Sequence, residues 1–142
     1  MKQLKIKYVR DVMKLQQFDV GDWIDLRCAK DMYLQKDKVY AIPLGVAMEL
    51  PEGYEAIVAP RSSTFKHWGI MAANSIGVID EAYKGDEDEW HFLALATRDT
   101  YVNKNERICQ FRIFEHQPTL QIIEVETLNN ENRGGIGSTG KE

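Results

Sequence analysis

Apolar and polar residues alternate with a period of two in several short stretches of the chain. Leu4, Ile6 and Tyr8 alternate with lysines, and the pattern returns near the C-terminal end, where Ile123 and Val125 alternate with glutamates. Successive side chains of a strand point to opposite faces of a sheet, so each stretch predicts a half-buried β-strand.

A third stretch covers residues 109–113, where Cys109, Phe111 and Ile113 share one face and Gln110 and Arg112 share the other. Clusters of Gly, Pro, Asp and Asn residues separate such stretches at short intervals and predict turns. Many short, closely spaced strands predict an all-β sandwich or barrel. Helix is expected only in short pieces, at residues 61–68 and, with a weaker pattern, at 11–17.

Composition changes sharply after Leu128. The last fourteen residues contain four of the ten glycines of the chain and one apolar side chain, Ile136. Such a segment buries too little apolar surface to fold alone. The sequence therefore predicts a β-barrel domain over residues 1–128 and a flexible, glycine-rich arm over residues 129–142.

Length and charge limit the function classes. The 142 residues suffice for one domain, and 18 Lys and Arg against 22 Asp and Glu give a net charge of −4, which argues against a nucleic-acid polymer as partner. The apolar runs are too short to span a membrane or form a signal peptide, so we expect a cytoplasmic protein. Cys28 and Cys109 lack neighbours at metal-ligand spacing, so neither a zinc site nor a disulfide is expected.

Two segments offer donors to phosphate oxygens. Arg61 is followed by three hydroxyl residues, among them Ser62 and Ser63, although either serine could instead cap a helical turn. In the C-terminal segment, Arg133 precedes glycines with adjacent hydroxyls, a composition that lets main-chain N–H groups converge on an anion.

The apolar stretch at residues 73–85 ends in a carboxylate. Asp80 is a candidate general base for a water molecule, Tyr83 follows three residues later, and the Asn74 amide could contact a polar ligand edge. The alternative interpretation is an aspartate in an ordinary turn.

In combination, five segments resemble in order the five motifs of the homotrimeric dUTPase (deoxyuridine 5'-triphosphate nucleotidohydrolase) family. The resemblance covers residues 21–140 and is closest to variants from Gram-positive bacteria and their phages. The segments are DWIDL (22–26), PRSS (60–63), NSIGVIDEAYKG (74–85), ERICQ (106–110) and RGGIGSTG (133–140).

The resemblance implies a distorted jelly-roll β-barrel of the dUTPase-like β-clip type, assembled as a homotrimer with an exchanged C-terminal arm and active sites at the subunit interfaces. The implied reaction is Mg²⁺-assisted hydrolysis of dUTP to dUMP and pyrophosphate, in which an Asp80-activated water attacks the α-phosphorus. This reaction limits uracil in DNA and supplies dUMP for dTTP synthesis.

The resemblance also implies the roles of individual residues. Asp25 matches the carboxylate that holds Mg²⁺ through water, and the remaining ligands come from substrate phosphates and water. Residues matching substrate-binding positions are Arg61, Ser62, Ser63, Asn74, Gly77, Val78, Ile79, Tyr83, Gln110, Arg133, Gly137, Ser138 and Thr139.

Two positions depart from the family pattern. Ser63 stands where a glycine is usual, and Ile136 stands where a phenylalanine stacks on uracil. Ile136 cannot stack as an aromatic ring does. We therefore predict that His91 or Phe92 supplies the lid, with Trp90 in the core.

Two other functions stay open from the sequence. One is dCTP deamination by an enzyme of the same fold, although that branch uses a glutamate where this chain has Asp80. The other is a phage regulatory or binding protein that uses the barrel as a docking surface. The acidic run at residues 86–89 would then be a partner patch, but a solvated turn is the favoured interpretation of such a run.

Overall fold

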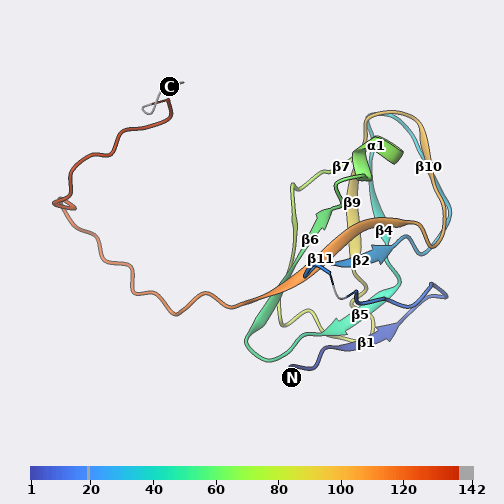
Figure 1. Cartoon of the computed structure of the whole chain (residues 1–142), viewed down its shortest axis with the longest axis horizontal. Coiled ribbons are helices and arrows are strands. Elements are labelled where there is room, and N and C mark those ends of the chain that lie inside the picture. Colours follow the sequence, from blue (N-terminus) through green and yellow to red (C-terminus); the bar gives the residue numbers. More distant parts are fainter. Residues whose placement is uncertain (19, 138–142) are drawn as a thin grey trace.

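The structure is a computed structural model that describes residues 1–18 and 20–137. Within these residues it contains eleven strands and one short helix (Figure 1). In chain order they are β1 (Lys5–Tyr8), β2 (Ile24–Arg27), β3 (Met32–Leu34), β4 (Val39–Pro43), β5 (Val46–Glu49), β6 (Tyr54–Pro60), α1 (Thr64–Trp68), β7 (Ile70–Ala72), β8 (Gly77–Ile79), β9 (His91–Ala96), β10 (Thr100–Val102) and β11 (Arg107–Glu115).

The strands form four small antiparallel sheets around one core. The largest has the order β2-β11-β6-β8, a second has the order β4-β9-β7, and two-stranded sheets pair β1 with β5 and β3 with β10. Most neighbours in these sheets are distant in sequence, as expected of a jelly-roll barrel rather than a meander. The predicted all-β, distorted barrel is confirmed.

Strand β11 follows the predicted alternation. Cys109 and Phe111 are buried, Ile113 packs partly against the core, and Gln110 and Arg112 lie on the opposite face. Phe111 meets Trp90 edge to face, with ring centroids 5.2 Å apart, and Trp90 is fully buried as predicted. This strand pairs with both β2 and β6, so it holds the largest sheet together.

Helix α1 confirms the helix expected near residues 61–68, whereas residues 11–17 form no helix. Gly69 ends α1 with φ of 64°, a left-handed conformation that favours glycine. A Cβ atom there would lie 2.6 Å from Arg98 Nε, so a side chain would also clash. Among the described residues, no helix is both long and apolar enough to cross a membrane.

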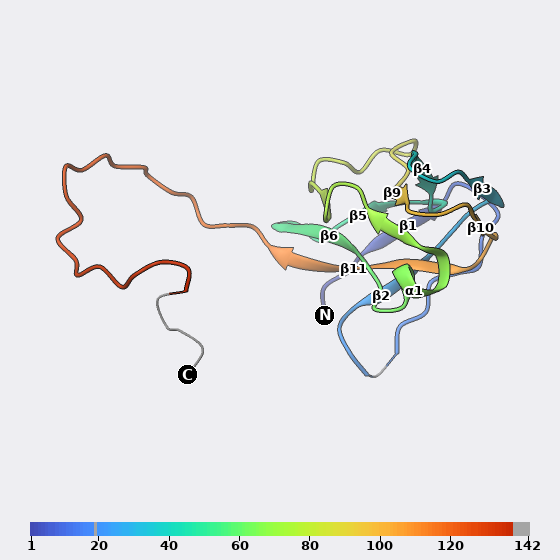
Figure 2. The same cartoon turned by 90° about the horizontal axis from the view of Figure 1, so that it is seen from above.

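The chain leaves the compact body after β11. Residues 117–137 contain no strand and extend far from the sheets (Figures 1 and 2). The strand predicted around Ile123 and Val125 is therefore absent from the single chain, where Ile122, Ile123 and Val125 are 94%, 67% and 52% exposed. Alternation had indicated a strand, but no neighbouring strand of the same chain is within its reach. The division between barrel and arm at residue 128 remains a prediction.

Candidate active site

The register of the largest sheet brings together the predicted metal-site residue, Asp25, and two predicted substrate-binding residues, Gln110 and Arg61. Asp25 on β2 lies directly opposite Gln110 on β11. Gln110 in turn lies opposite Ala59 on β6, and Arg61 follows the last residue of β6, Pro60. The Gln110 Nε2 group donates to the Pro60 carbonyl at 3.1 Å, which fixes the amide beside Arg61.

Two arginines hold the Asp25 carboxylate. Arg61 Nε lies 3.1 Å from Oδ1 and Arg107 Nη1 lies 3.2 Å from Oδ2. The Asp25 and Arg61 side chains are only 21% and 23% exposed, so solvent screens this pair less than a fully exposed one. Arg107 was not among the predicted site residues, although it belongs to the fourth family-like segment, ERICQ.

A buried threonine anchors the loop that carries Arg61. The Thr64 hydroxyl accepts a hydrogen bond from the Arg61 main-chain N–H at 2.8 Å and donates to the Ile108 carbonyl at 2.9 Å. Ser63 occupies the N-cap position of α1 but makes no capping hydrogen bond with its side chain. Its hydroxyl is therefore not committed to the capping role that was the alternative to phosphate binding.

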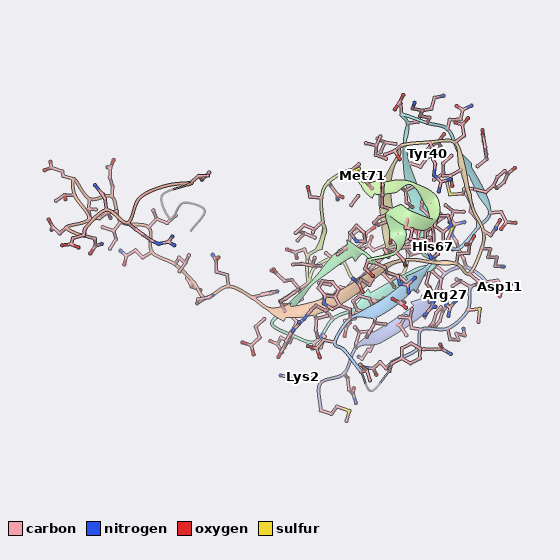
Figure 3. The ribbon with its side chains drawn as sticks, turned by 45° about the horizontal axis from the view of Figure 1, so that its top comes forward. Lys2, Asp11, Arg27, Tyr40, His67 and Met71 are labelled. Atoms are coloured by element: carbon pink, nitrogen blue, oxygen red, sulfur yellow. The ribbon has the colours of Figure 1, made fainter. Side chains whose placement is uncertain are left out.

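Arg61 and Arg107 border an open depression of about 380 Å³. Arg27, Arg61 and Arg107 line it together with His67, and Figure 3 labels Arg27 and His67 at this end of the molecule. Arg27 is tied to the Asn105 carbonyl by a hydrogen bond of 2.7 Å. Three guanidinium groups around one depression favour a multiply charged anion. Of the three arginines, only Arg61 was among the predicted site residues, because Arg27 and Arg107 meet only through the pairing of β2 with β11.

A second pocket, of about 340 Å³, lies around β8. Strand β8 pairs with β6, and Gly77 lies opposite Val58 of β6. The pocket brings together all six predicted residues of the hairpin with one predicted lid residue. They are Asn74, Gly77, Val78, Ile79, Asp80, Tyr83 and His91.

The turn after β8 orients the Asp80 carboxylate. Its Oδ1 atom accepts a hydrogen bond from the Ala82 N–H at 2.7 Å, and its carbonyl accepts one from the Tyr83 N–H at 3.0 Å. Asp80 is otherwise exposed in the pocket. The second carboxylate oxygen is thus the one presented to a ligand or a water molecule.

Tyr83 and His91 form the ring-bearing wall of this pocket. The Tyr83 hydroxyl donates to the Glu89 carbonyl at 2.8 Å, and His91 Nδ1 lies 3.0 Å from the same oxygen. Desolvation, and secondarily Asp88 and Glu89, raise the pKa of Tyr83, so the hydroxyl stays a donor. Phe92 points to the opposite face of β9 and is 2% exposed in the core. Phe92 is therefore corrected to a core residue, and His91 remains the lid candidate.

The two sites are far apart within one chain. Asp80 directly follows Ile79, which pairs with Ala56 near the start of β6, whereas Arg61 follows the end of that strand. At about 3.3 Å per residue, the chain from Glu55 to Arg61 spans about 20 Å. The two residues therefore lie at opposite ends of β6, and they line separate pockets.

The C-terminal candidates lie away from both sites. Arg133 and Gly137 belong to the segment that extends from the body, and neither lines the two pockets. Ser138 and Thr139 lie outside the described residues. Their roles remain predictions.

His116 and the acidic run at residues 86–89 both make specific contacts within the chain. His116 Nε2 lies 3.3 Å from Glu81 Oε1, which also accepts from the Gly53 N–H at 3.0 Å. In the acidic run, Asp86 Oδ1 lies 3.6 Å from Lys7 Nζ, Asp88 accepts from the Gly85 N–H, and Glu89 binds Arg10. These internal contacts favour a structured turn over a docking patch.

Within the described residues, no group of three or more His, Cys, Asp or Glu side chains is arranged to hold a metal ion. Asp25 is a single carboxylate beside cationic side chains. This donor set suits Mg²⁺ only if phosphates and waters supply most of the ligands, which is the usual coordination of Mg²⁺ with nucleotides.

Comparison with known proteins agrees with this arrangement. The dUTPase family model matches residues 16–140, and the chain belongs to this family. It is 56% identical over 139 residues to the SPbeta prophage-derived deoxyuridine 5'-triphosphate nucleotidohydrolase of Bacillus subtilis strain 168, covering 97% of this chain and 98% of the relative. A deoxyuridine 5'-triphosphate nucleotidohydrolase of Hydrogenobaculum is 37% identical over 122 residues, covering 82% of each chain.

Solved structures show the same fold. The dUTPase of Staphylococcus bacteriophage 80alpha, described as controlling transfer of virulence genes, has a TM-score of 0.77 at 18% identity and covers 90% of this chain and 99% of its own. A mutant dUTPase from phage phi11 of S. aureus has a TM-score of 0.76 at 15% identity, with 89% and 98% covered, and is described as coordinating a structural Mg(II) ion.

Proposed function

We propose that this protein hydrolyses dUTP to dUMP and pyrophosphate. The observation that carries the proposal is the pocket in which Asp80, Tyr83 and the 74–79 hairpin converge in a chain of the dUTPase family. The named relatives act on the same substrate, which favours this reaction over the deamination of dCTP.

In the proposed mechanism, Asp80 acts as the general base. The Ala82 N–H holds one carboxylate oxygen, so the other accepts a proton from a water that attacks the α-phosphorus. Tyr83 packs against the deoxyribose, and Asn74 with the hairpin main chain contacts uracil. A pocket that pairs specific polar edges discriminates against bases that lack them.

Arg61, Gln110, Ser62 and Ser63 bind the phosphates, and we add Arg107 to this set because it lies in the same basic depression. Asp25 holds the two arginines and would contact the hydration shell of a bound Mg²⁺. The ion would neutralise phosphate charge and polarise the bonds to the leaving pyrophosphate.

The working unit is a homotrimer in which another chain supplies the phosphate-binding residues. The outer face of the β4-β9-β7 sheet supports this proposal, because Val39, Met71 and Leu93 on it are 53%, 50% and 37% exposed. Val39 and Met71 both pair with Leu95 of β9, so these side chains and Leu93 form one exposed aliphatic stripe. Strand β9 begins at His91, which lines the pocket, so the stripe lies next to the pocket. A second copy packed on this face would bury the stripe next to the pocket.

A groove in the body offers a docking position for the C-terminal segment of another copy. A groove of about 640 Å³ between β1 and β2 is lined by Ile6, Ile24 and Ile113, with Lys2 and Lys5 among its basic residues. Strand β2 is also an open edge of its sheet. We propose that residues 120–126, which include four apolar and two acidic side chains, pack there and carry the arm toward the neighbouring active site.

Pyrophosphate release from dUTP, dTTP, dCTP and UTP, with and without Mg²⁺, tests the function. Of the four nucleotides, we expect only dUTP to release pyrophosphate. Asp80→Asn should lower kcat about 10²–10⁴-fold, the range that a general base contributes. Asp86→Asn, on the same loop, is the matched control and should keep wild-type turnover. Unchanged turnover in Asp80→Asn would refute the mechanism, and ammonia release from dCTP would instead support deamination.

A further inference from the structure

The acidic run at residues 86–89 contains one carboxylate that is largely withdrawn from solvent. The Glu89 side chain is 13% exposed, and it accepts hydrogen bonds from Arg10 Nε at 2.7 Å and Arg10 Nη2 at 3.2 Å. The hydrogen bond to Glu89 raises the pKa of Arg10, so the guanidinium stays charged. A two-pronged pair of this kind fixes orientation as well as distance.

Gly45 holds the same carboxylate from the main chain. Its N–H donates to Glu89 Oε2 at 3.0 Å, and its φ of 74° lies in the left-handed region. A Cβ at this position would lie 2.9 Å from Val12 Cγ1. The backbone therefore brings a donor to Glu89 in a conformation and a space that suit glycine.

The main-chain carbonyl of Glu89 contacts both ring-bearing residues of the substrate pocket. It accepts the Tyr83 hydroxyl at 2.8 Å and lies 3.0 Å from His91 Nδ1. Arg10 itself does not line that pocket. A restraint on the Glu89 side chain is thereby transmitted through one residue to two side chains that face the substrate.

We propose that Arg10 and Glu89 form a positioning unit that sets Tyr83 and His91 for nucleotide binding, an inference that rests on the proposed function. His91 Nε2 lies 3.7 Å from Glu89 Oε1. Without Arg10, the Glu89 carboxylate keeps the Gly45 N–H and turns toward His91. That movement displaces both the imidazole and the carbonyl, and a small displacement of positioning groups costs substrate binding.

The test measures steady-state dUTP hydrolysis by Arg10→Ala, Glu89→Gln and the double variant. We expect KM to rise about five- to tenfold in each single variant, with kcat within about twofold of wild type. The double variant should be no worse than either single variant, because both remove the same unit. Millimolar guanidinium should restore the KM of Arg10→Ala, and Arg10→Lys should be intermediate because a lysine cannot make the two-pronged pair.

Asp11→Asn is the matched control. It breaks an exposed pair with Lys104, at 3.0 Å, on the same N-terminal segment, and it should leave KM unchanged. A wild-type KM in Arg10→Ala would overturn the positioning unit but not the proposed function. Increases in KM that multiply when the two substitutions are combined would have the same consequence. Failure of the wild-type chain to hydrolyse dUTP would overturn the proposed function, and this inference with it.

Discussion

The Asp80 pocket and the Arg61 depression are the two half-sites of the proposed active site. Their separation leads to a quantitative prediction for assemblies that contain two different variants of the chain. Asp80→Asn removes the base from one half-site, and Arg61→Ala removes a phosphate ligand from the other, about 20 Å away along β6. Each variant alone should form an assembly with almost no activity. When the two are unfolded, mixed in equal amounts and refolded together, some sites regain both residues.

The size of the recovery follows from the assembly. A site is intact only when its Asp80 comes from an Arg61→Ala chain and its Arg61 comes from an Asp80→Asn chain. Each condition is met with a probability of about one half, so about a quarter of the sites in randomly mixed closed rings are intact. Pyrophosphate release should therefore return to about one quarter of that of refolded wild type.

The assay needs one matched mixture. Gln110→Ala mixed with Arg61→Ala should recover nothing, since both residues lie in the same half-site of the same chain. Absence of recovery in the first mixture, with refolded wild type active, would show that Asp80 and Arg61 act from one chain. Recovery in both mixtures would refute the division into these half-sites.

Three smaller perturbations probe the anchors and the buried groups. Thr64→Val keeps the volume but strands the Arg61 N–H and the Ile108 carbonyl, so urea unfolding at fixed protein concentration should show a loss of about 2–4 kcal/mol, larger than for Thr64→Ser. Burial raises the pKa of the Cys28 and Cys109 thiols, so both stay protonated at neutral pH, and a thiol reagent should label them only after unfolding. His91→Ala should raise KM for dUTP about tenfold, and the KM of His91→Phe should lie between those of wild type and His91→Ala, because the ring remains but its contact with the Glu89 carbonyl is lost; an unchanged KM in His91→Ala would refute the lid.

The alternation of apolar and polar residues predicted a strand correctly where the fold supplies neighbouring strands. The alternation around Phe111 survives because β11 is flanked by partners on both sides. The same pattern around Ile123 predicted a strand that the single chain does not form, because a strand needs a neighbour and this segment has none within its own chain. Alternation specifies a preference for a sheet, and topology decides whether a sheet is available.

The site shows the same division. Asp80 and Gln110 were identified because their neighbours in sequence form recognisable motifs. Glu89 and Arg10 are 79 residues apart, so nothing in either segment announces their contact. Glu89 was grouped with exposed acidic neighbours, although the fold nearly buries its carboxylate.

This contrast explains why residue patterns predict each half-site, whereas the sharing of a site between chains was expected only from the family resemblance. Within one half, strand register fixes the geometry: Asp25, Gln110 and the residue before Arg61 are neighbours on three paired strands. In the proposed assembly, the geometry between halves depends on an aliphatic stripe that includes Met71 and Leu93, residue types that any core would contain. Sequence motifs identify polar groups that contact the substrate. Aliphatic side chains contribute only packing, and their sequence pattern does not distinguish a subunit interface from a core. A catalytic site divided between chains therefore depends on contacts that its own motifs do not encode.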